Sequence, residues 1–321
     1  MIKIQLSLES IEKIKDIYWK DMKTQATGLV EVLKTQDARD FLKGKKQYTQ
    51  LYKYFYHKNG KPNRENLKKL LLADKQQMEK YIDKFGKFSD GDSRELCEKV
   101  FRYDTFSGRK TAYDILKIQK VTVCPYCNRQ YIFTLSNHKV RPQFDHYYPK
   151  SIYPYLAVSI FNLIPSCSIC NQAKSNLDTH DKPILYPYEE EFGDEVRFRI
   201  SSDDIKYLHG MTEEFDLWLE KAGVSNDKIK KVDEQIDTFH LSELYNEHKD
   251  YIKDIAWNHY INSEERIDEI MRVFPQLFRT REDAMAILYM NDIRKENLGK
   301  RPLAKLTRDI YRELNIIKDT L

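Results

Sequence analysis

Two Cys-x-x-Cys pairs constrain this chain more than any other feature of its sequence. They are Cys124-Pro-Tyr-Cys127 and Cys167-Ser-Ile-Cys170. Two residues between cysteines allow both sulfurs of a turn to reach one metal ion, and four thiolates at about 2.3 Å complete a tetrahedral zinc site. A thioredoxin-like redox role would need one such pair in a βαβ setting, so it explains two pairs poorly. The spacing therefore predicts one structural zinc ion.

The expected cellular compartment favours metal binding over disulfide bonds. The start of the sequence, Met1-Ile-Lys-Ile-Gln-Leu, has no apolar run of the length that a signal peptide needs. We therefore expect a cytoplasmic protein, in which thiols stay reduced and paired Cys-x-x-Cys motifs favour a metal. The fifth cysteine, Cys97, lies in a helical pattern and is expected to be a buried, inert thiol.

The segment between the two cysteine pairs predicts two short strands and a helix. Arg141 to His146 has the pattern of a strand that ends at a loop, which Pro149 and Pro154 keep irregular. A second apolar stretch begins at Phe161, and a helix is expected from Asn171 onward. The stretch around His138 is typical of a hairpin tip, and Tyr147 and Tyr148 are interpreted as packing residues.

This central segment resembles the HNH endonucleases, whose ββα-metal fold is often braced by a zinc ion between two Cys-x-x-Cys knuckles. The matching residues are Asp145-His146, Asn162-Leu163 and Cys167-Ser-Ile-Cys170-Asn171-Gln-Ala-Lys174. The last histidine of the family pattern is an asparagine here, which is a common variant. The motif covers about fifty of the 321 residues. The expected fold class is mainly α with a small central α+β module of the ββα-metal, treble-clef-like kind.

The resemblance implies a role for each matching residue. His146 would be the general base that takes a proton from the attacking water, a task suited to imidazole. Asp145 and Asn171 would hold one catalytic Mg²⁺ or Mn²⁺ ion through oxygen ligands. Asn162 would fix the loop so that His146 points correctly. Lys174 would reach a substrate phosphate as a point charge.

Each of these residues also has a simpler interpretation. An Asp-His pair on a strand is often a surface pair, an Asn after a knuckle often caps a helix, and a Lys there is usually solvated. A zinc-braced module that binds nucleic acid without catalysis is the rival function. It does not require Asp145-His146 together with Asn171 and Lys174, and this chain has all four.

Both flanks of the module are expected to be helical, because glycine and proline are sparse and 32% of residues are charged. Apolar residues recur at helical spacing in several stretches, and Val196 to Ile200 alternates like a strand. Asp92 and Ser93 are expected to cap one of the N-terminal helices. The predicted domains are a basic helical domain (1–120), the HNH module (121–182) and an acidic helical domain (183–321). No apolar run reaches the roughly 18 residues that a membrane span needs.

The small net charge of +4 conceals two oppositely charged halves. Residues 1–120 hold 27 Lys and Arg against 17 Asp and Glu, whereas residues 183–321 hold 21 against 30. Lysines and tyrosines alternate between Lys43 and Lys58. They predict either a surface that tracks a phosphate backbone and stacks on bases, or a solvated helix with its tyrosines turned inward.

The sequence thus favours a metal-dependent endonuclease that hydrolyses DNA, with RNA as the less favoured substrate. One site cuts one strand, so a double-strand break would need a homodimer or two events. The knuckles and the Asp-His loop also look like the HNH effectors of bacterial anti-phage systems, such as those paired with an ATPase in Septu and some retrons. That looser similarity implies antiviral defence, and an ATPase partner without which the nuclease would be inactive.

Overall fold

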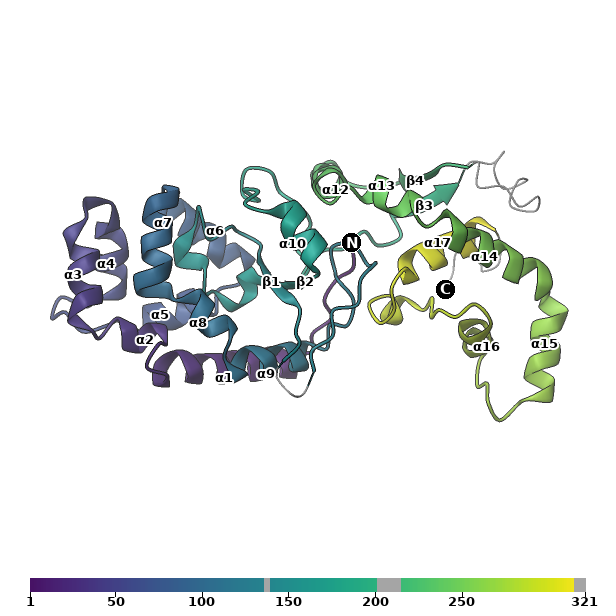
Figure 1. Ribbon diagram of the computed structural model, residues 1–321, viewed down its shortest axis with the longest axis horizontal. Coiled ribbons are helices and arrows are strands. Elements are labelled where there is room, and N and C mark those ends of the chain that lie inside the picture. Colours follow the sequence, from purple (N-terminus) through teal and green to yellow (C-terminus); the bar gives the residue numbers. More distant parts are fainter. Residues whose placement is uncertain (136–138, 201–214, 315–321) are drawn as a thin grey trace. The chain divides into compact units, whose positions relative to one another are not determined.

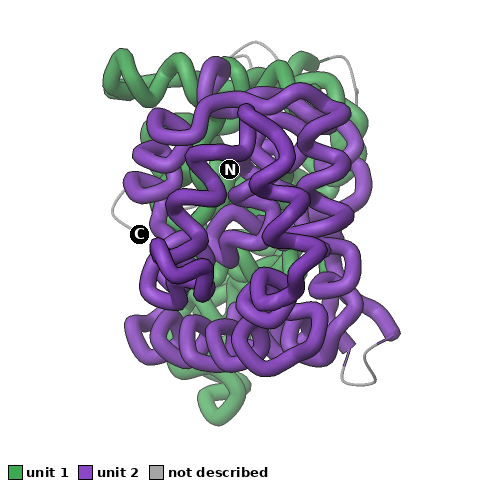
Figure 2. Tube along the Cα trace, turned by 90° about the vertical axis from the view of Figure 1, so that its left-hand side faces the viewer, with its two compact units in different colours: residues 1–4, 121–132, 184–321 green, residues 5–120, 133–183 purple. Residues whose placement is uncertain are grey.

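The computed structural model describes residues 1–135, 139–200 and 215–314 (Figure 1). His138, expected at a hairpin tip, lies outside these residues. The described chain is mostly helical, as the sequence predicts, and it holds two small two-stranded sheets. The sequence predicts the strands of the first sheet and one strand of the second, but not the partner strand Leu217–Lys221. It divides into two compact units, each shown in its own colour in Figure 2. The division into three consecutive domains that the sequence favours stays a prediction.

The larger stretch of the unit formed by Gln5–Lys120 and Phe133–Pro183 is helical, and its remainder holds a small sheet. Its elements are α1 (Leu8–Thr24), α2 (Leu29–Val32), α3 (Gln36–Gly44), η1 (Lys46–Tyr48), α4 (Thr49–Phe55), α5 (Arg64–Leu71), α6 (Lys75–Phe85), α7 (Asp90–Leu96), the π-helical η2 (Cys97–Phe101), α8 (Tyr103–Ser107), α9 (Lys110–Gln119), β1 (Gln143–His146), η3 (Pro154–Leu156), η4 (Ile160–Asn162), β2 (Leu163–Ser166) and α10 (Ser168–Lys174).

Helix starts in this unit follow local side-chain chemistry, with one correction to the sequence prediction. The Ser7 and Asp74 side chains accept hydrogen bonds from backbone N–H groups of the first turns of α1 and α6. Helix α7 begins at Asp90, not at Asp92 or Ser93, because the Ser89 hydroxyl accepts from the Asp92 N–H and takes the cap position.

The alternating lysines and tyrosines between Lys43 and Lys58 lie on the end of α3, on η1 and on α4. Tyr48 and Tyr56 are buried, and their hydroxyls donate to Asp92 Oδ1 at 2.9 Å and to the Leu33 carbonyl at 2.8 Å. The inward orientation of these two tyrosines excludes them as stacking platforms for bases. The lysines of the run are exposed, except Lys45, which is half-buried and paired with Glu95.

The other unit comprises Met1–Ile4, Val121–Ile132 and Ile184–Leu321. Its described elements are β3 (Val196–Ile200), β4 (Leu217–Lys221), α12 (Asn226–Thr238), α13 (Leu241–Asn246), α14 (Lys249–Ile261), α15 (Glu264–Val273), α16 (Arg281–Leu288), η5 (Lys295–Asn297) and α17 (Ala304–Glu313). β3 and β4 pair antiparallel, with Phe198 opposite Leu219. The apolar residues of β3 are buried and its arginines are half-buried, which confirms the predicted alternation.

Backbone hydrogen bonds of the first residues join the three stretches of this unit, and α17 packs against β3 within the third stretch. Backbone hydrogen bonds run from Ile2 N–H to the Pro125 carbonyl at 2.9 Å and from Ile4 N–H to the Pro187 carbonyl at 2.7 Å. Helix α17 packs against β3, where the carboxylate of Asp309 accepts from the Phe198 N–H at 2.9 Å. Among the described residues, no helix combines the length and apolarity that crossing a membrane requires.

Candidate functional site: a four-cysteine cluster and an Asp-His-Asn pocket

The four cysteines of the two Cys-x-x-Cys pairs come together in the structure. All four are buried, and their sulfur atoms lie within 4.8 Å of one another. A tetrahedral ion with bonds of about 2.3 Å separates its sulfurs by about 3.8 Å, so the cluster has the size of a zinc site. Four thiolates close the coordination sphere and leave no position for substrate. The cluster is consistent with structural zinc, as the sequence predicts.

Backbone groups next to the cysteines already point at the sulfurs. The Arg129 N–H donates to Cys127 Sγ, and the Cys170 N–H donates to Cys167 Sγ, both at 3.4 Å. Such donors stabilise the thiolate form, which is the form that binds a metal. Cys167 is also the N-cap of α10, so the second knuckle and the helix begin at the same residue.

Asn128 is a structural residue of the first knuckle that the sequence analysis missed. It has a φ of +53° and is fully buried. Its amide donates to the Leu298 carbonyl at 2.8 Å and accepts from the Lys305 N–H at 3.0 Å. Asn tolerates a left-handed conformation better than most residues. An asparagine directly after Cys127 could therefore have indicated a left-handed turn at this position.

Strands β1 and β2 and helix α10 form the predicted ββα element. The strands pair antiparallel, with Asp145 opposite Ile164 and His146 opposite Leu163. Asn171 lies within α10 and is not its cap, because the cap position belongs to Cys167. Helix α10 thus begins at Ser168, three residues before the predicted start, and it carries Asn171 and Lys174, while Asp145 and His146 end β1.

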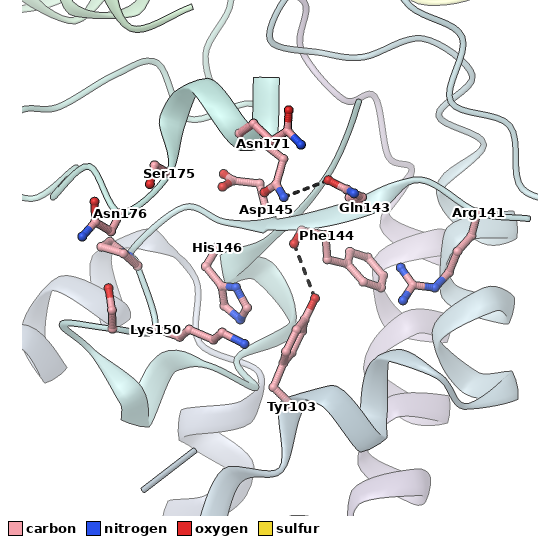
Figure 3. Close-up of a pocket in the computed structure, with 13 residues that line it drawn as sticks. Tyr103, Arg141, Gln143, Phe144, Asp145, His146, Lys150, Asn171, Ser175 and Asn176 are labelled. Carbon is pink, nitrogen blue, oxygen red and sulfur yellow. Dashed lines mark hydrogen bonds between the residues drawn. The ribbon is translucent and has the colours of Figure 1, made fainter. Parts of the chain in front are cut away.

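A pocket of about 640 Å³ collects three of the predicted site residues: Asp145, His146 and Asn171 (Figure 3). Asp145 and Asn171 lie on one side of β1 in this view, and the His146 ring lies on the other, with Tyr103 and Lys150. Successive strand residues point to opposite faces, which explains the separation. Residues from both faces of β1 belong to the lining of the pocket.

The His146 ring is buried and held in one orientation. Its Nε2 lies 3.0 Å from the Ala157 carbonyl oxygen, and Tyr103 meets the ring edge to face at 4.3 Å. A carbonyl only accepts, so Nε2 carries the proton and Nδ1 is the acceptor. Burial, and then the charge of Lys150, lowers the pKa of His146 to about 3. The imidazole is therefore neutral near pH 7, the form that accepts a proton.

The helical part of the same unit fixes the loop that carries the Ala157 carbonyl. The buried Tyr18 hydroxyl on α1 donates to the Val158 carbonyl, and the Ser159 hydroxyl donates to the Leu70 carbonyl of α5 at 2.8 Å. Both residues follow Ala157 directly. The helices thus position the acceptor that orients His146, a connection that no local sequence pattern reveals.

Tyrosines after the Asp-His pair pack into the same helical part, as predicted for Tyr147 and Tyr148. Both are buried, and the Tyr148 hydroxyl donates to Glu79 Oε1 at 3.1 Å. The hydroxyl of Tyr155, also buried, donates to the Gly86 carbonyl at 3.0 Å. These contacts leave Tyr147 and Tyr148 unable to stack on a nucleic acid.

Asn162 is fully buried and does not line the pocket. Its Oδ1 accepts from the Tyr148 N–H at 2.8 Å, and its Nδ2 donates to the carbonyls of Tyr148 and Leu156 at 3.0 Å. These three bonds hold together the two ends of the loop that starts after His146. The geometry fits the predicted loop-fixing part of its role.

Lys174 differs from its predicted position. Its side chain is buried, and its ammonium donates to Asp145 Oδ1 at 3.2 Å and to the His146 carbonyl at 2.6 Å. The predicted contact with a substrate phosphate does not fit this place, because helix α10 turns the lysine toward β1 and away from the pocket lining. In the described structure Lys174 holds Asp145 and His146 through these two contacts, on the side of the pair that does not line the pocket.

Three further residues at the pocket were missed by the sequence analysis. Gln143 Oε1 accepts from Asn171 Nδ2 at 2.9 Å, which fixes the amide of Asn171 (Figure 3). Arg141 and Lys150 also line the pocket, half-buried. Arg141 lies over the Phe144 ring at 5.5 Å and Lys150 over the Tyr103 ring at 4.6 Å. The pocket lining thus contains two cationic side chains, Arg141 and Lys150, and one carboxylate, that of Asp145.

The described residues define a mostly helical protein with a ββα element and a buried four-cysteine cluster. A segment of 64 residues is 36% identical to Septu protein PtuB of Bacillus thuringiensis. The match spans 20% of this chain and 23% of that protein, so it is a partial similarity covering less than a quarter of the relative. No protein-family model and no solved structure matches the chain.

Proposed function

We propose that this chain is a metal-dependent HNH endonuclease that hydrolyses DNA phosphodiester bonds within a bacterial defence system. One observation carries the proposal: Asp145, His146 and Asn171 line the same pocket, and the Ala157 carbonyl leaves His146 Nδ1 as the acceptor. A neutral, oriented imidazole and oxygen ligands that line one pocket are the two components that metal-dependent phosphodiester hydrolysis needs.

His146 supplies the base in this proposal. Its Nδ1 takes a proton from a water molecule, whose oxygen forms a bond to phosphorus while the bond to the 3′ oxygen breaks. The leaving oxygen takes a proton from solvent, which gives 5′-phosphate and 3′-hydroxyl ends. Tyr103 and the Ala157 carbonyl keep the imidazole from rotating as its charge changes.

Asp145 and Asn171 would hold the catalytic Mg²⁺ or Mn²⁺. The donor set fits a hard cation, because it offers a carboxylate and an amide whose Nδ2 is engaged by Gln143, so that Oδ1 serves as the ligand atom. A bound ion of this kind neutralises charge on the phosphate and the leaving oxygen. Lys174 holds Asp145 in place through Oδ1.

The charge at the pocket favours a polyanionic substrate. Arg141 and Lys150 line it, and the helical stretch before the module is basic, with a net charge of +10 over residues 1–120. Cations near a cleft raise the local concentration of nucleic acid and contact its phosphates. We assign phosphate contact to Arg141 and Lys150 in place of Lys174.

The partial similarity to Septu protein PtuB supports a role in anti-phage defence. An ATPase partner that gates the nuclease remains a proposal from the resemblance of the central segment to HNH effectors of anti-phage systems. A homodimer is the assembly that would let two such sites cut both strands.

The four-cysteine cluster would hold zinc as a brace and take no part in catalysis.

Plasmid nicking with Mg²⁺ or Mn²⁺ tests the proposal. The wild type, His146→Ala and His57→Ala are compared, with a chelator control; His57 is exposed and outside the pocket. We expect metal-dependent nicking that is lost in His146→Ala and retained in His57→Ala, with similar thermal midpoints for all three proteins. Equal nicking by His146→Ala would refute the assigned base.

The same assay separates the alternatives. A folded, zinc-loaded wild type that binds DNA but never cuts it supports a zinc-braced binding module. Cutting that appears only when an ATPase partner is added supports a partner-gated nuclease. Preferential cutting of RNA would change the substrate but keep the mechanism.

A further inference from the structure

A second pocket lies on the helical part of the unit that holds the Asp-His-Asn pocket. Its volume is about 450 Å³, and its lining comes from η1, α4, the end of α6 and the segment between α6 and α7: Lys46, Gln47, Gln50, Leu51, Phe85 and Phe88. It shares no lining residue with the Asp-His-Asn pocket. A site of this size, with an apolar floor and a few polar groups, is typical of small-ligand binding.

Two phenylalanines give this pocket an aromatic wall. Helix α6 ends at Phe85, and Gly86 follows with a φ of +71°, a conformation that favours glycine and reverses the chain before Phe88. Both rings are half-buried. Phe85 packs against Tyr155 at 5.1 Å and Phe88 against Tyr48 at 6.1 Å, so the rings are held before any ligand arrives.

The polar groups of the pocket suit a nucleotide. Gln50 is exposed, and its amide offers both a donor and an acceptor, as the edge of a base requires. Lys46 is exposed beside it. Gln47 is also exposed, and its amide nitrogen donates to Asp92 at 2.9 Å. Leu51 is fully buried and forms part of the apolar floor.

The segment that supplies four of the lining residues is rich in lysine, although Lys45 within it is paired with Asp92 and Glu95 of α7. Residues 43–61 contain six lysines and no acidic residue. Lys84 adds a further charge, 5.4 Å from the centre of the Phe85 ring. An aromatic wall beside a lysine-rich surface is the combination by which proteins bind single-stranded nucleic acid, with bases on the rings and phosphates near the lysines.

We propose that this pocket binds one unpaired nucleobase of a single-stranded segment, with Phe85 and Phe88 as the stacking wall, Gln50 at the base edge and Lys46 on the adjacent phosphate. The inference rests on the proposed function in one respect, since it assumes nucleic acid as the partner. It adds a recognition site for unpaired strand, separate from the cleavage pocket.

Binding of a fluorescein-labelled oligodeoxythymidylate, followed by anisotropy, tests the pocket. The same oligonucleotide annealed to its complement is the duplex probe, and no Mg²⁺ or Mn²⁺ is added, so that cleavage does not consume either probe. The first variant is Phe88→Leu, which keeps an apolar side chain but removes the ring. The second is the double variant Lys46→Ala/Gln50→Ala, and both of these residues are exposed.

The matched control is Lys58→Ala/Gln76→Ala. It removes the same side chains from exposed positions outside the pocket lining, and Lys58 belongs to the same lysine-rich run. We expect Phe88→Leu to weaken single-strand binding on the order of tenfold, as the loss of one base stack does. The pocket double variant should reduce the salt slope of binding by about 0.7, the value for one phosphate contact. Duplex binding should change far less in Phe88→Leu.

Unchanged single-strand binding by folded Phe88→Leu and by the pocket double variant would overturn the inference. An equal loss in the Lys58→Ala/Gln76→Ala control would overturn it as well, because the effect would then be general charge. Plasmid nicking is scored separately. If the wild type nicks plasmid and the pocket variants bind single strand normally, the nuclease stands and the base pocket is refuted. If the wild type does not nick plasmid but the pocket variants lose single-strand binding, the nuclease is refuted and the base pocket stands.

Discussion

Replacement of Lys174 with methionine tests the buried arrangement behind the Asp-His pair. The side chains of Lys174 and Asp145 are 0% and 3% exposed, and their charged atoms lie 3.2 Å apart. Removal of one partner from a buried ion pair typically costs about 3–5 kcal/mol, because the other charge stays buried without compensation. Methionine has a similar length and is unbranched, so little of this loss would come from packing.

The lysine also satisfies the backbone of the adjacent residue. Its ammonium donates to the His146 carbonyl at 2.6 Å, and the variant would leave that carbonyl without this donor. A buried acceptor that loses its partner costs about 1–3 kcal/mol, although the two losses share one ammonium and do not simply add. We therefore expect Lys174→Met to lower the free energy of unfolding by about 3–5 kcal/mol.

The assay is urea unfolding at pH 7, with zinc present, followed by circular dichroism. Lys182→Met is the control, since Lys182 is exposed eight positions further along the chain. It should stay within about 0.5 kcal/mol of the wild type, as surface substitutions usually do. Addition of Asp145→Asn to Lys174→Met should restore part of the lost stability, because no unpaired charge then remains.

A loss of under about 1 kcal/mol in Lys174→Met would refute this reasoning. It would mean that the ammonium reaches solvent, as the sequence-based assignment to a substrate phosphate required. A double variant no more stable than Lys174→Met alone would show that the loss comes from packing and not from the charge of Asp145.

Four further predictions follow from the site. Cys167→Ser should lose the zinc ion and the cooperative thermal transition, whereas His146→Ala should keep both; metal analysis finding no zinc in unchelated wild type would contradict the four-cysteine site. Asn162→Leu should slow plasmid nicking about 10- to 100-fold, as the loss of an orienting partner typically does; an unchanged rate in folded protein would count against its loop-fixing role. Gln143→Leu should raise the Mg²⁺ concentration for half-maximal nicking about tenfold with little change at saturating metal; a loss that saturating metal does not rescue would oppose that assignment. Cys97 is half-buried and not fully buried as the sequence predicts, and burial raises the pKa of its thiol to about 11; native, zinc-loaded protein should therefore show no fast-reacting thiol toward Ellman's reagent at pH 8, and chelation should raise the number to at least four, whereas one fast thiol before chelation would show that Cys97 is reactive.

Local patterns predicted the elements that depend on local chemistry. The cysteine spacing indicated the cluster, and the apolar alternation indicated the strand at Val196–Ile200. Pro149 and Pro154 prevent a strand from continuing, which predicts the Asp-His pair at the end of a strand, and β1 ends at His146. Turn geometry, strand period and proline sterics act over a few residues, so one sequence is enough to read them.

Contacts between distant segments escaped prediction. Lys174 and Asp145 are 29 residues apart, and nothing in the sequence near Lys174 distinguishes a buried lysine from a solvated one. Tyr18 lies 140 residues before the carbonyl that it contacts next to Ala157. Such pairs depend on how helices pack, which hydrophobic periodicity alone does not specify. For the same reason, the sequence does not reveal that Tyr18 of α1 holds the loop whose Ala157 carbonyl orients His146.

The interleaving of the two units has a consequence for the synthesis and proteolysis of the chain. Ile4 pairs with Pro187, so the first residues must wait for much of the chain to leave the ribosome before their partner exists. A single protease cut in the stretch 133–183 would still leave both fragments contributing to the unit that holds β3 and β4. Nicked protein should therefore run as two bands under denaturing conditions yet elute as one species in native buffer.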